Sequence, residues 1–445
     1  MSQSEEILGV FAGALGLEPA DVRFTGDATL ASAYAVSDFA AASLAAAALA
    51  VRELMDVAGA VTVDRSLADR WFAAALTPLG WRLPSPWDAV AGDYATADGW
   101  IRLHTNAPRH KAAALGVLGV EADRDAVAAA VADRAGDELE AAVVRAGGGA
   151  AVMRSATEWS RHPQGSSIAA EPLVHLAEGG TGPQSAHWIP SRDRPLAGLR
   201  VLDLTRVIAG PVATRFLAGL GADVLRVDPP DWDEPAIVPE MTLGKRATRI
   251  DATAPVGRDA LERLVAGADL VVHGYRPGAL DALVSAERRR ELRPGLVEVA
   301  LDAYGWTGPW SGRRGFDSLV QMSSGIAEAG MRWAGAERPT PLPVQALDHA
   351  TGYLAAAAAI VAVGRMRRDG VSTTSRVSLA RTALELPPEG PVDVARLREP
   401  AVHSGSRIAT PWGAAELLEP PVMVGDVRLE WQRGPVDLGS SEPRW

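Results

Sequence analysis

Residues 195–230, which read PLAGLRVLDLTRVIAGPVATRFLAGLGADVLRVDPP, decide the fold. Leu199–Leu204 is a predominantly apolar segment that predicts a buried strand. Pro211 stands where a helix can begin, because a proline in the first turn loses no hydrogen bond. We predict that this helix ends at Gly221 and that a second strand follows at Val224–Val227. The segment is therefore expected to form a βαβ unit.

Two further strands are predicted at Leu270–His273 and Leu296–Leu301, accompanied by amphipathic helices at residues 257–266 and 279–292. Strands that alternate with helices form parallel sheets with helical crossovers. The expected fold class is α/β, with an open parallel Rossmann-like sheet and a smaller α+β domain.

A stretch rich in Pro, Gly and Ser at residues 178–198 is expected to be a linker between two parts of different composition. The part before it, residues 1–177, is expected to be helical, with Ala-rich helices near residues 38–56 and 122–146. Between these helices, GDYATADGWIRLHT predicts a short strand or hairpin.

The part after the linker, residues 199–445, is expected to hold the sheet. A second Ala-rich helix is predicted from Asp348 to about Arg367. The tail from Arg407 is rich in Trp, Gly and Pro, and we expect it to be irregular.

Composition excludes several classes of function. The 445 residues carry a formal net charge of -11, which argues against a general nucleic-acid binder. The absence of cysteine removes disulfides, thiolate metal sites and a Cys nucleophile. HExxH and GxSxG patterns are also absent, so neither metal hydrolysis nor serine-type acyl chemistry is indicated, and no metal is expected.

The acidic start, MSQSEEILGVFAGAL, does not resemble a signal peptide. The longest apolar runs, Phe39–Val51 and Tyr353–Val363, are too short to span a bilayer and are predicted to be buried helices. We therefore expect a cytoplasmic protein with no membrane or nucleic-acid partner.

The sequence also contains an internal echo. AVSDFAAASLAAAALAV at residues 35–51 aligns with QALDHATGYLAAAAAIV at residues 345–361, which places Asp38 on Asp348. RSLAD and VSLAR follow the two segments at nearly the same offset, which favours a duplication. Each aspartate stands near a predicted helix start, so an N-cap is the alternative to a chemical role for both.

Lys245, Arg246 and Arg276 are predicted to lie in loops. We expect all three at the carboxyl edge of the sheet, where cations are well placed to bind phosphates. The alternative is ordinary solvated charge. The turn before Pro211 lacks the G-x-G-x-x-G pattern, so it is either a ligand site at the helix start or only a tight turn.

The segment at residues 195–230 resembles the opening of the family III (CaiB/BaiF) CoA-transferases. The similarity continues, in the family's order, through GKRATRID, ADLVVHGYRPGALDAL, AYGWTGPWSGRRGFDSLVQMSSG and PVQALDHATGYLAAAAAI. The resemblance implies an α/β domain that binds coenzyme A and a catalytic Asp348 that forms covalent intermediates. It also implies coenzyme contacts from Ile208, Ala209, Lys245, Arg246, Arg276 and Tyr304.

The first part of the chain resembles the later half of a second family member, in VSDFAAASLAAAALA, GDYATADGWIRLHTN and SATEWSRHPQG. The chain is thus expected to be a rearranged fusion, either an intramolecular pseudo-dimer or a homodimer. By the motif Asp38 would be a second catalytic residue. Because its half lacks the coenzyme-binding strands, we expect it to be a structural relic that caps the helix beginning near Phe39.

Two departures from the family pattern bear on function. Phe316 stands where the racemase branch carries His before Asp, and phenylalanine cannot exchange a proton. Asp-Pro-Pro follows Val227, without the Arg that some transferases place there. The expected function is transfer of coenzyme A from an acyl-CoA to a small carboxylic acid through an aspartyl-CoA thioester. The alternatives are a 2-methylacyl-CoA racemase or epimerase, and a non-catalytic CoA-binding scaffold.

Overall fold

The computed structural model describes residues 1–56, 59–389 and 405–445. A seven-stranded sheet lies at its centre, in the order β10-β9-β8-β11-β12-β13-β7. The first six strands in that order run parallel, and β7 pairs antiparallel with β13 at one edge. The expected α/β class with an open parallel sheet is confirmed. The strands are β7 (His175–Thr181), β8 (Arg200–Leu204), β9 (Asp223–Asp228), β10 (Arg246–Arg249), β11 (Leu270–His273), β12 (Val297–Asp302) and β13 (Val371–Ser378).

The predicted βαβ unit is present as β8, α9 (Ala209–Gly219) and β9. Its strands are almost entirely buried, which explains why most of their residues are apolar. Gly221 has a φ of 104° after the helix, a conformation that glycine adopts without strain. The predicted helix at residues 257–266 is α11 (Pro255–Gly267), whereas that at 279–292 is shorter, α12 (Ala286–Leu292). Ser285 sets its start by accepting the N–H of Arg288.

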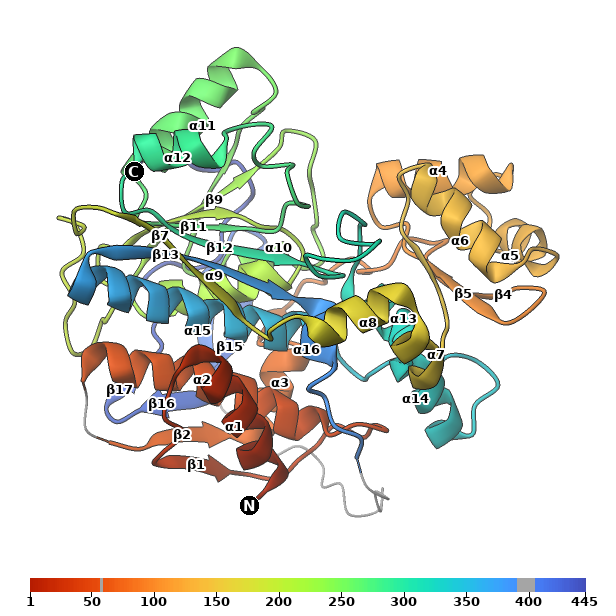
Figure 1. The fold of residues 1–445 in the computed structure, drawn as a ribbon, viewed down its shortest axis with the longest axis horizontal. Coiled ribbons are helices and arrows are strands. Elements are labelled where there is room, and N and C mark those ends of the chain that lie inside the picture. Colours follow the sequence, from red (N-terminus) through yellow and green to blue (C-terminus); the bar gives the residue numbers. More distant parts are fainter. Residues whose placement is uncertain (57–58, 390–404) are drawn as a thin grey trace.

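Two long helices, α2 (Val36–Met55) and α15 (Ala346–Asp369), pack against each other beside the sheet (Figure 1). Both are buried over most of their length, as their apolar sequences predict. By length and composition α15 is apolar enough to cross a membrane, but 94% of its most apolar window is buried inside the protein. That burial is typical of a core helix.

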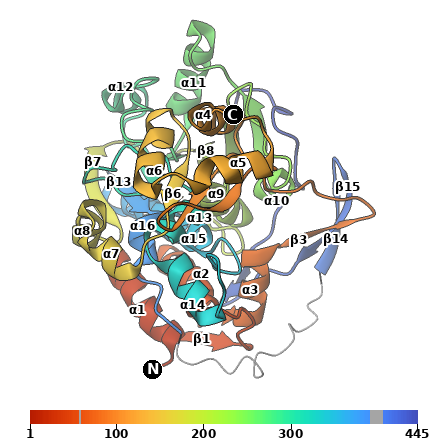
Figure 2. The ribbon, with the colours of Figure 1, turned by 90° about the vertical axis from the view of Figure 1, so that its right-hand side faces the viewer.

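The predicted hairpin is β4 (Gly92–Ala95) and β5 (Trp100–Leu103), and β6 (Ala150–Val152) completes a three-stranded sheet. With α4 (Pro108–Leu118) it belongs to a small domain with its own core, to the right in Figure 1 and nearest the viewer in Figure 2. The single helix predicted near residues 122–146 is wrong. It is divided into α5 (Arg124–Ala132) and α6 (Gly136–Arg145), because Asp98 accepts the Gly136 N–H and starts a new helix there.

The prediction of an irregular tail from Arg407 is wrong as far as residue 428 and holds for residues 429–445, which form no helix or strand. Residues 405–428 contain β14 (Gly405–Thr410), β15 (Gly413–Leu418), β16 (Val422–Val424) and β17 (Val427–Arg428). β15 pairs with β3 (Leu76–Leu79), and β16 pairs with β2 (Val61–Asp64), which itself pairs with β1 (Val22–Thr25). The partners of these tail strands come from the beginning of the sequence, which is why the local pattern did not reveal them.

The two parts of the sequence are therefore interleaved in space. β7, at residues 175–181, extends across the expected boundary at residue 178 and joins the sheet of the second part. The tail strands complete two sheets of the first part. The remaining helices are α1 (Gln3–Leu15), α3 (Arg65–Ala73), α7 (Ala156–Arg161), α8 (Pro163–Ala170), α10 (Val238–Met241), α13 (Asp317–Ser323), α14 (Ile326–Ala334) and α16 (Leu379–Ala383).

Candidate active site

Asp348 lies in the first turn of α15 and is 6% exposed. The N-cap residue of this helix is Gln345, which makes no side-chain cap, so Asp348 is not an N-cap. Its backbone N–H donates to Oδ2 of Asp317 at 2.9 Å. Among the residues that the structure describes, no side chain donates a hydrogen bond to the Asp348 carboxyl. This carboxyl is buried without a structural partner of its own.

Asp317 is the residue that the sequence reasoning missed. It begins α13, is 1% exposed, and accepts hydrogen bonds from the Asp348 N–H and from Nε2 of Gln321. It therefore caps the start of α15 from a neighbouring helix. The only sequence signal was its place after Phe316 in the Gly-Phe-Asp motif, and nothing in the pattern revealed that it lies beside Asp348.

The two carboxyl groups disturb each other's ionisation. Burial raises the pKa of Asp348 well above its usual range, and the neighbouring Asp317 carboxyl raises it further. Burial raises the pKa of Asp317 to about 6, although hydrogen bonds from the Asp348 N–H, from Gln321 and from the Leu347 N–H oppose the shift. Two close buried carboxyls resist carrying two negative charges, so the pair retains a proton above the pH at which an exposed aspartate loses its own.

Phe316, next to this pair, is packed against two histidines of the small domain. The ring of His104 stacks on Phe316 with centroids 3.6 Å apart, and His110 approaches its edge at 5.7 Å. Burial lowers the pKa of His104 to about 3 and that of His110 to about 4, so both imidazoles are neutral at physiological pH. The small domain therefore forms one wall beside the carboxyl pair.

A group of three arginines, Arg109, Arg276 and Arg314, lies beside this wall, and we call it the arginine cluster. Burial lowers the pKa of Arg314, and the positive charges of Arg276 and Arg109 lower it further, so each of these two guanidinium groups lies near Arg314. Within the described residues none of the three forms a salt bridge; Arg276 donates only a long 3.4 Å bond to the Gly312 carbonyl. Three unpaired cations from separate segments form a region of positive potential that attracts anions.

Of the cations expected to bind phosphate, Arg276 alone belongs to this cluster. Lys245 is fully buried, and its Nζ donates to Asp203 at 2.9 Å, to Thr214 at 2.6 Å and to the Pro211 carbonyl at 3.0 Å. All three of its donors are used, so none is left for a phosphate. Burial lowers the pKa of Lys245 to about 8, although Asp203 opposes the shift.

Arg246 lies at the opposite edge of the sheet from Arg276. It starts β10, so it is at the amino end of a parallel strand, and it pairs with both carboxyl oxygens of Asp223. Arg276 follows β11, at the carboxyl edge. The expectation that one edge gathers Lys245, Arg246 and Arg276 is wrong, because Lys245 and Arg246 lie at the start of β10 whereas Arg276 follows the end of β11.

The expected contacts at Ile208 and Ala209 lie in the turn between β8 and α9, at the carboxyl edge. A Cβ added to Gly352, one helical turn beyond Asp348, would lie 2.4 Å from the Ala209 carbonyl oxygen, so the turn lies directly against α15. Val207, the residue before Ile208, has a φ of 67°, which is rare for a β-branched residue. Glu234 accepts the Val207 N–H at 3.1 Å and holds the turn in this conformation.

The structure places the last expected coenzyme contact, Tyr304, in the core. Its side chain is 1% exposed and its hydroxyl lies 3.0 Å from Oγ of Ser323. Its carbonyl accepts from Nε2 of Gln164, on α8. Tyr304 therefore connects elements at the junction with the small domain, and its ring is not presented to a ligand.

Asp38, the echo of Asp348, lies in the first turn of α2, where the N-cap residue Ala35 also makes no side-chain cap. The prediction that Asp38 caps this helix is wrong. Its Oδ1 accepts from Oγ of Ser4 and from Nη1 of Arg65, the latter at 3.2 Å. The carboxylate thus ties α2 to α1 and α3.

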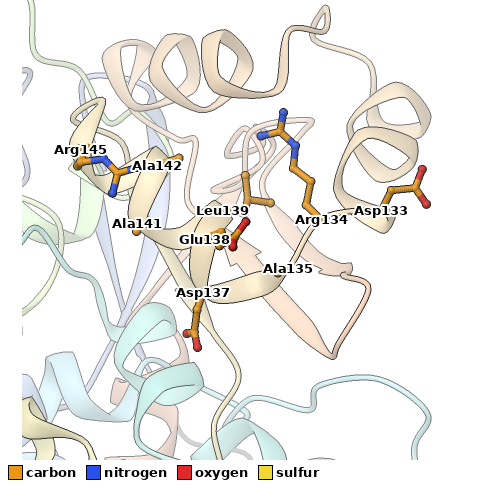
Figure 3. A pocket seen from close by; sticks show the side chains of 9 residues that line it. All are labelled: Asp133, Arg134, Ala135, Asp137, Glu138, Leu139, Ala141, Ala142 and Arg145. Carbon is orange, nitrogen blue, oxygen red and sulfur yellow. The ribbon is translucent and has the colours of Figure 1, made fainter.

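A cavity of about 680 Å³ lies apart from this site. Its lining residues fall between positions 133 and 145, in the connection after α5 and in α6 of the small domain (Figure 3). No group of three or more His, Asp or Glu side chains that could hold a metal ion occurs in the described part of the chain.

Residues 196–407 match the sequence model of CoA-transferase family III. Similar proteins include the acetyl-coenzyme A transferase nodX of Hypoxylon pulicicidum, 31% identical over 51% of this chain and 41% of the relative. The probable fatty acyl-CoA transferase Rv3272 of Mycobacterium tuberculosis is 31% identical over 43% of this chain and 52% of the relative. Human succinyl-CoA:glutarate CoA-transferase is 34% identical over 36% of this chain and 40% of the relative. The chain thus spans about half the length of these relatives, or less.

A crystal structure of Rv3272 aligns with a TM-score of 0.39 at 30% identity, over 43% of this chain and 57% of that one. A CaiB/BaiF family protein from Brucella suis aligns with a TM-score of 0.38 at 24% identity, over 50% and 65%. The family match falls on the segment that carries the parallel strands β8 to β13 and Asp348. Residues 196–407 of this chain are therefore similar in sequence to CoA-transferase family III.

Proposed function

We propose that the protein transfers coenzyme A from an acyl-CoA to a carboxylic acid, with Asp348 as the nucleophile. The observation that carries the proposal is the state of its carboxyl group, which is buried at the start of α15 and accepts no hydrogen bond from any described side chain. A buried carboxyl without a stabilising partner is costly to keep, and such groups are concentrated at functional sites. The activities of the relatives support the same chemistry.

The reaction proceeds through four displacements at acyl carbonyls. An oxygen of Asp348 attacks the thioester carbonyl of the donor, and the CoA thiolate leaves, which gives a mixed anhydride. The thiolate then attacks the Asp348 carbonyl, which releases the donor acid and leaves an aspartyl-CoA thioester. The acceptor carboxylate attacks this thioester and expels the thiolate, giving a second anhydride. Finally the thiolate attacks the acceptor's carbonyl, which forms the new acyl-CoA and regenerates the Asp348 carboxylate.

Asp317 positions the nucleophile in this scheme. Because its carboxyl accepts the Asp348 N–H, it fixes the first turn of α15 and with it the direction of the nucleophile's side chain. Its negative charge also opposes ionisation of Asp348, and attack requires the ionised form. Burial on the carboxyl edge, with the small domain as a wall, would exclude the water that hydrolyses an anhydride.

The arginine cluster supplies binding for the phosphates of coenzyme A. Arg109, Arg276 and Arg314 have no carboxylate partners in the described structure, and Arg109 and Arg314 lie near His110, which packs against Phe316. Charge-assisted bonds from guanidinium to phosphate are among the stronger polar contacts in proteins. Binding energy from this remote part of the substrate would hold the thioester against Asp348.

We also propose that the chain is an intramolecular pseudo-dimer. The packing of α2 along α15 and the pairing of tail strands with strands of the first part support this assignment. Sedimentation of the intact chain as a monomer with full activity is the expected result, and activity confined to a dimer would contradict it.

The decisive experiment is mass spectrometry of the protein after incubation with an acyl-CoA. We expect a coenzyme A adduct on the peptide that contains Asp348, and none in the Asp348→Asn variant, while Asp38→Asn keeps the adduct. Exchange of the acyl α-proton with solvent, without transfer, would instead support a racemase. Binding of CoA with neither adduct nor exchange would indicate a scaffold.

A further inference from the structure

A second cavity, of about 420 Å³, lies at the amino edge of the sheet, opposite the edge that carries Asp348. Gly198 precedes β8, Ala222 and Asp223 begin β9, and Gly244 precedes β10. Gln432, Arg433 and Trp445 of the tail close it from the other side. Parallel strands of five or six residues separate the two edges by roughly 17–20 Å. The cavity is therefore distinct from the candidate active site.

This cavity carries net positive charge in a protein whose net charge is -11. Its charged lining residues are Arg194, Arg246, Arg433 and Asp223. Arg246 is neutralised by its two bonds to Asp223. The guanidinium groups of Arg194 and Arg433 form no hydrogen bond or ion pair with any part of the chain that the structure describes. Two unpaired guanidinium groups thus face one cavity.

A glycine and a hydrogen-bonded indole fix the walls of the cavity. Gly221 has a φ of 104°, and a Cβ there would lie 3.2 Å from Nε of Arg194, so the guanidinium side chain rests against this glycine. The indole of Trp445 is fixed by a 2.8 Å hydrogen bond from its Nε1 to the Leu264 carbonyl. The Arg246 guanidinium lies 5.9 Å from the centre of this ring. The cavity therefore combines a rigid apolar wall with two available cations.

We propose that this cavity binds a phosphomonoester, with its dianionic phosphate between Arg194 and Arg433 and its organic part against Trp445. Two guanidinium groups match the charge of a phosphomonoester, and arginine can donate two parallel hydrogen bonds to phosphate oxygens. The volume lies in the range of small-molecule sites, with room for an organic group beyond the phosphate. The bound ester would join the tail to the starts of β8 and β9.

Isothermal titration with adenosine 5′-monophosphate tests the proposal. We expect wild-type protein to bind this probe, and the double variant Arg194→Gln, Arg433→Gln to bind it at least tenfold more weakly. Neither side chain bonds to the rest of the protein, so the melting temperature of the unliganded variant should equal that of wild type. Arg258→Gln, an exposed arginine elsewhere on the surface, should leave the affinity unchanged. Equal affinity in wild type and double variant, or no binding to either, would overturn the site.

Three further titrations fix the class of ligand and the location. Adenosine should not bind, and inorganic phosphate should bind more weakly than the monophosphate; phosphate binding as tight as that of the ester would overturn the assignment to a phosphomonoester. The Arg314→Gln variant should bind adenosine monophosphate as tightly as wild type does. Weaker binding by this variant would show that the probe binds at the arginine cluster and not in this cavity. Coenzyme A should bind the double variant as it binds wild type. Weaker binding of coenzyme A by the double variant would show that the cavity is part of the coenzyme site, and would contradict its assignment as a separate site.

Discussion

The helices α2 and α15 begin alike and are used differently. Each has an N-cap residue without a side-chain cap, and each carries an aspartate at its third position, Asp38 or Asp348. Asp38 is bound by Ser4 of α1 and Arg65 of α3. Asp348 lies beside the carboxyl group of Asp317, and no side chain in the described structure donates a hydrogen bond to the Asp348 carboxyl. The same sequence motif is thus a structural contact in α2 and, in the proposed mechanism, the nucleophile in α15, according to the side chains that the neighbouring elements place beside it.

The largest expected effect comes from Asp348→Asn. Transfer should fall by at least about a thousandfold, because no nucleophile remains. The variant should be more stable than wild type at neutral pH. In wild type the raised pKa of Asp348 means that the unfolded chain releases a proton that the folded chain retains, and this release favours unfolding. Asparagine does not ionise, so the variant lacks this penalty. This gain should vanish below about pH 4, where both states are protonated. Turnover assays and thermal melts at pH 4 and 7 measure both effects, and wild-type turnover would remove Asp348 from the mechanism.

The pH dependence of transfer tests the carboxyl pair. Because attack requires ionised Asp348 and its pKa is raised, the turnover rate should increase with pH above the usual aspartate range, about tenfold per unit on the acid limb. Asp317→Asn retains an oxygen for the Asp348 N–H but removes the opposing charge, so the midpoint should move to lower pH. An unchanged midpoint would show that the two carboxyls are not coupled in the working enzyme.

Single replacements in the arginine cluster should weaken binding of free CoA. For Arg109→Gln, Arg276→Gln and Arg314→Gln we expect the dissociation constant to rise about 5- to 100-fold each, the range of a lost charge-assisted hydrogen bond. Arg246→Gln is the matched control, because that guanidinium lies at the opposite edge and is paired with Asp223. If the control weakens CoA binding and the cluster variants do not, the binding edge is assigned wrongly.

The turn beside α15 provides a smaller effect. Glu234 accepts the N–H of Val207, whose left-handed conformation costs about 1–3 kcal/mol. We expect Glu234→Gln to raise the KM for acyl-CoA about 3- to 10-fold while the turnover rate changes little. Adding Val207→Gly, which adopts this conformation freely, should restore most of the loss. Failure of the glycine to rescue would show that Glu234 acts through Arg226 or Trp232, its other partners.

The smallest effect on activity is expected from Asp38→Asn. Turnover should stay within about threefold of wild type, whereas the free energy of unfolding should fall by about 1–2 kcal/mol, because the partly buried ion pair with Arg65 is lost and the hydrogen bond from Ser4 loses its charged acceptor. Arg65→Gln should cause a similar loss, and the double variant should lose less than the sum of the two. Loss of transfer in Asp38→Asn, with the fold intact, would erase the difference between the two helices.

Most of the sheet was predictable because its signals are local. The apolar runs of β8 and β9, the glycine after α9 and the hairpin of the small domain each depend on residues close in sequence. Asp348 was also found locally, from its motif. Asp317 was not, because its role arises only when α13 is placed against α15.

The errors have physical causes of the same kind. Lys245 was expected to bind phosphate from a loop at the carboxyl edge, yet its side chain reaches Asp203 in the core and neutralises it there. Arg246 was assigned to the wrong edge because the direction of its strand was not considered. The tail appeared irregular because its short strands carry little pattern of their own and depend on β2 and β3 for their pairing.

The pairing of β16 with β2 also sets the order in which the chain can fold during synthesis. β2 lies at residues 61–64 and its partner at residues 422–424, so almost the entire chain is made between them. At ribosomal rates of about 5–20 residues per second, roughly 20–70 s pass between the synthesis of β2 and the synthesis of β16. During that time an open strand edge is exposed to other nascent chains. Chaperone binding to this edge, rather than to the sheet around β8, would then govern the yield of folded protein in the cell.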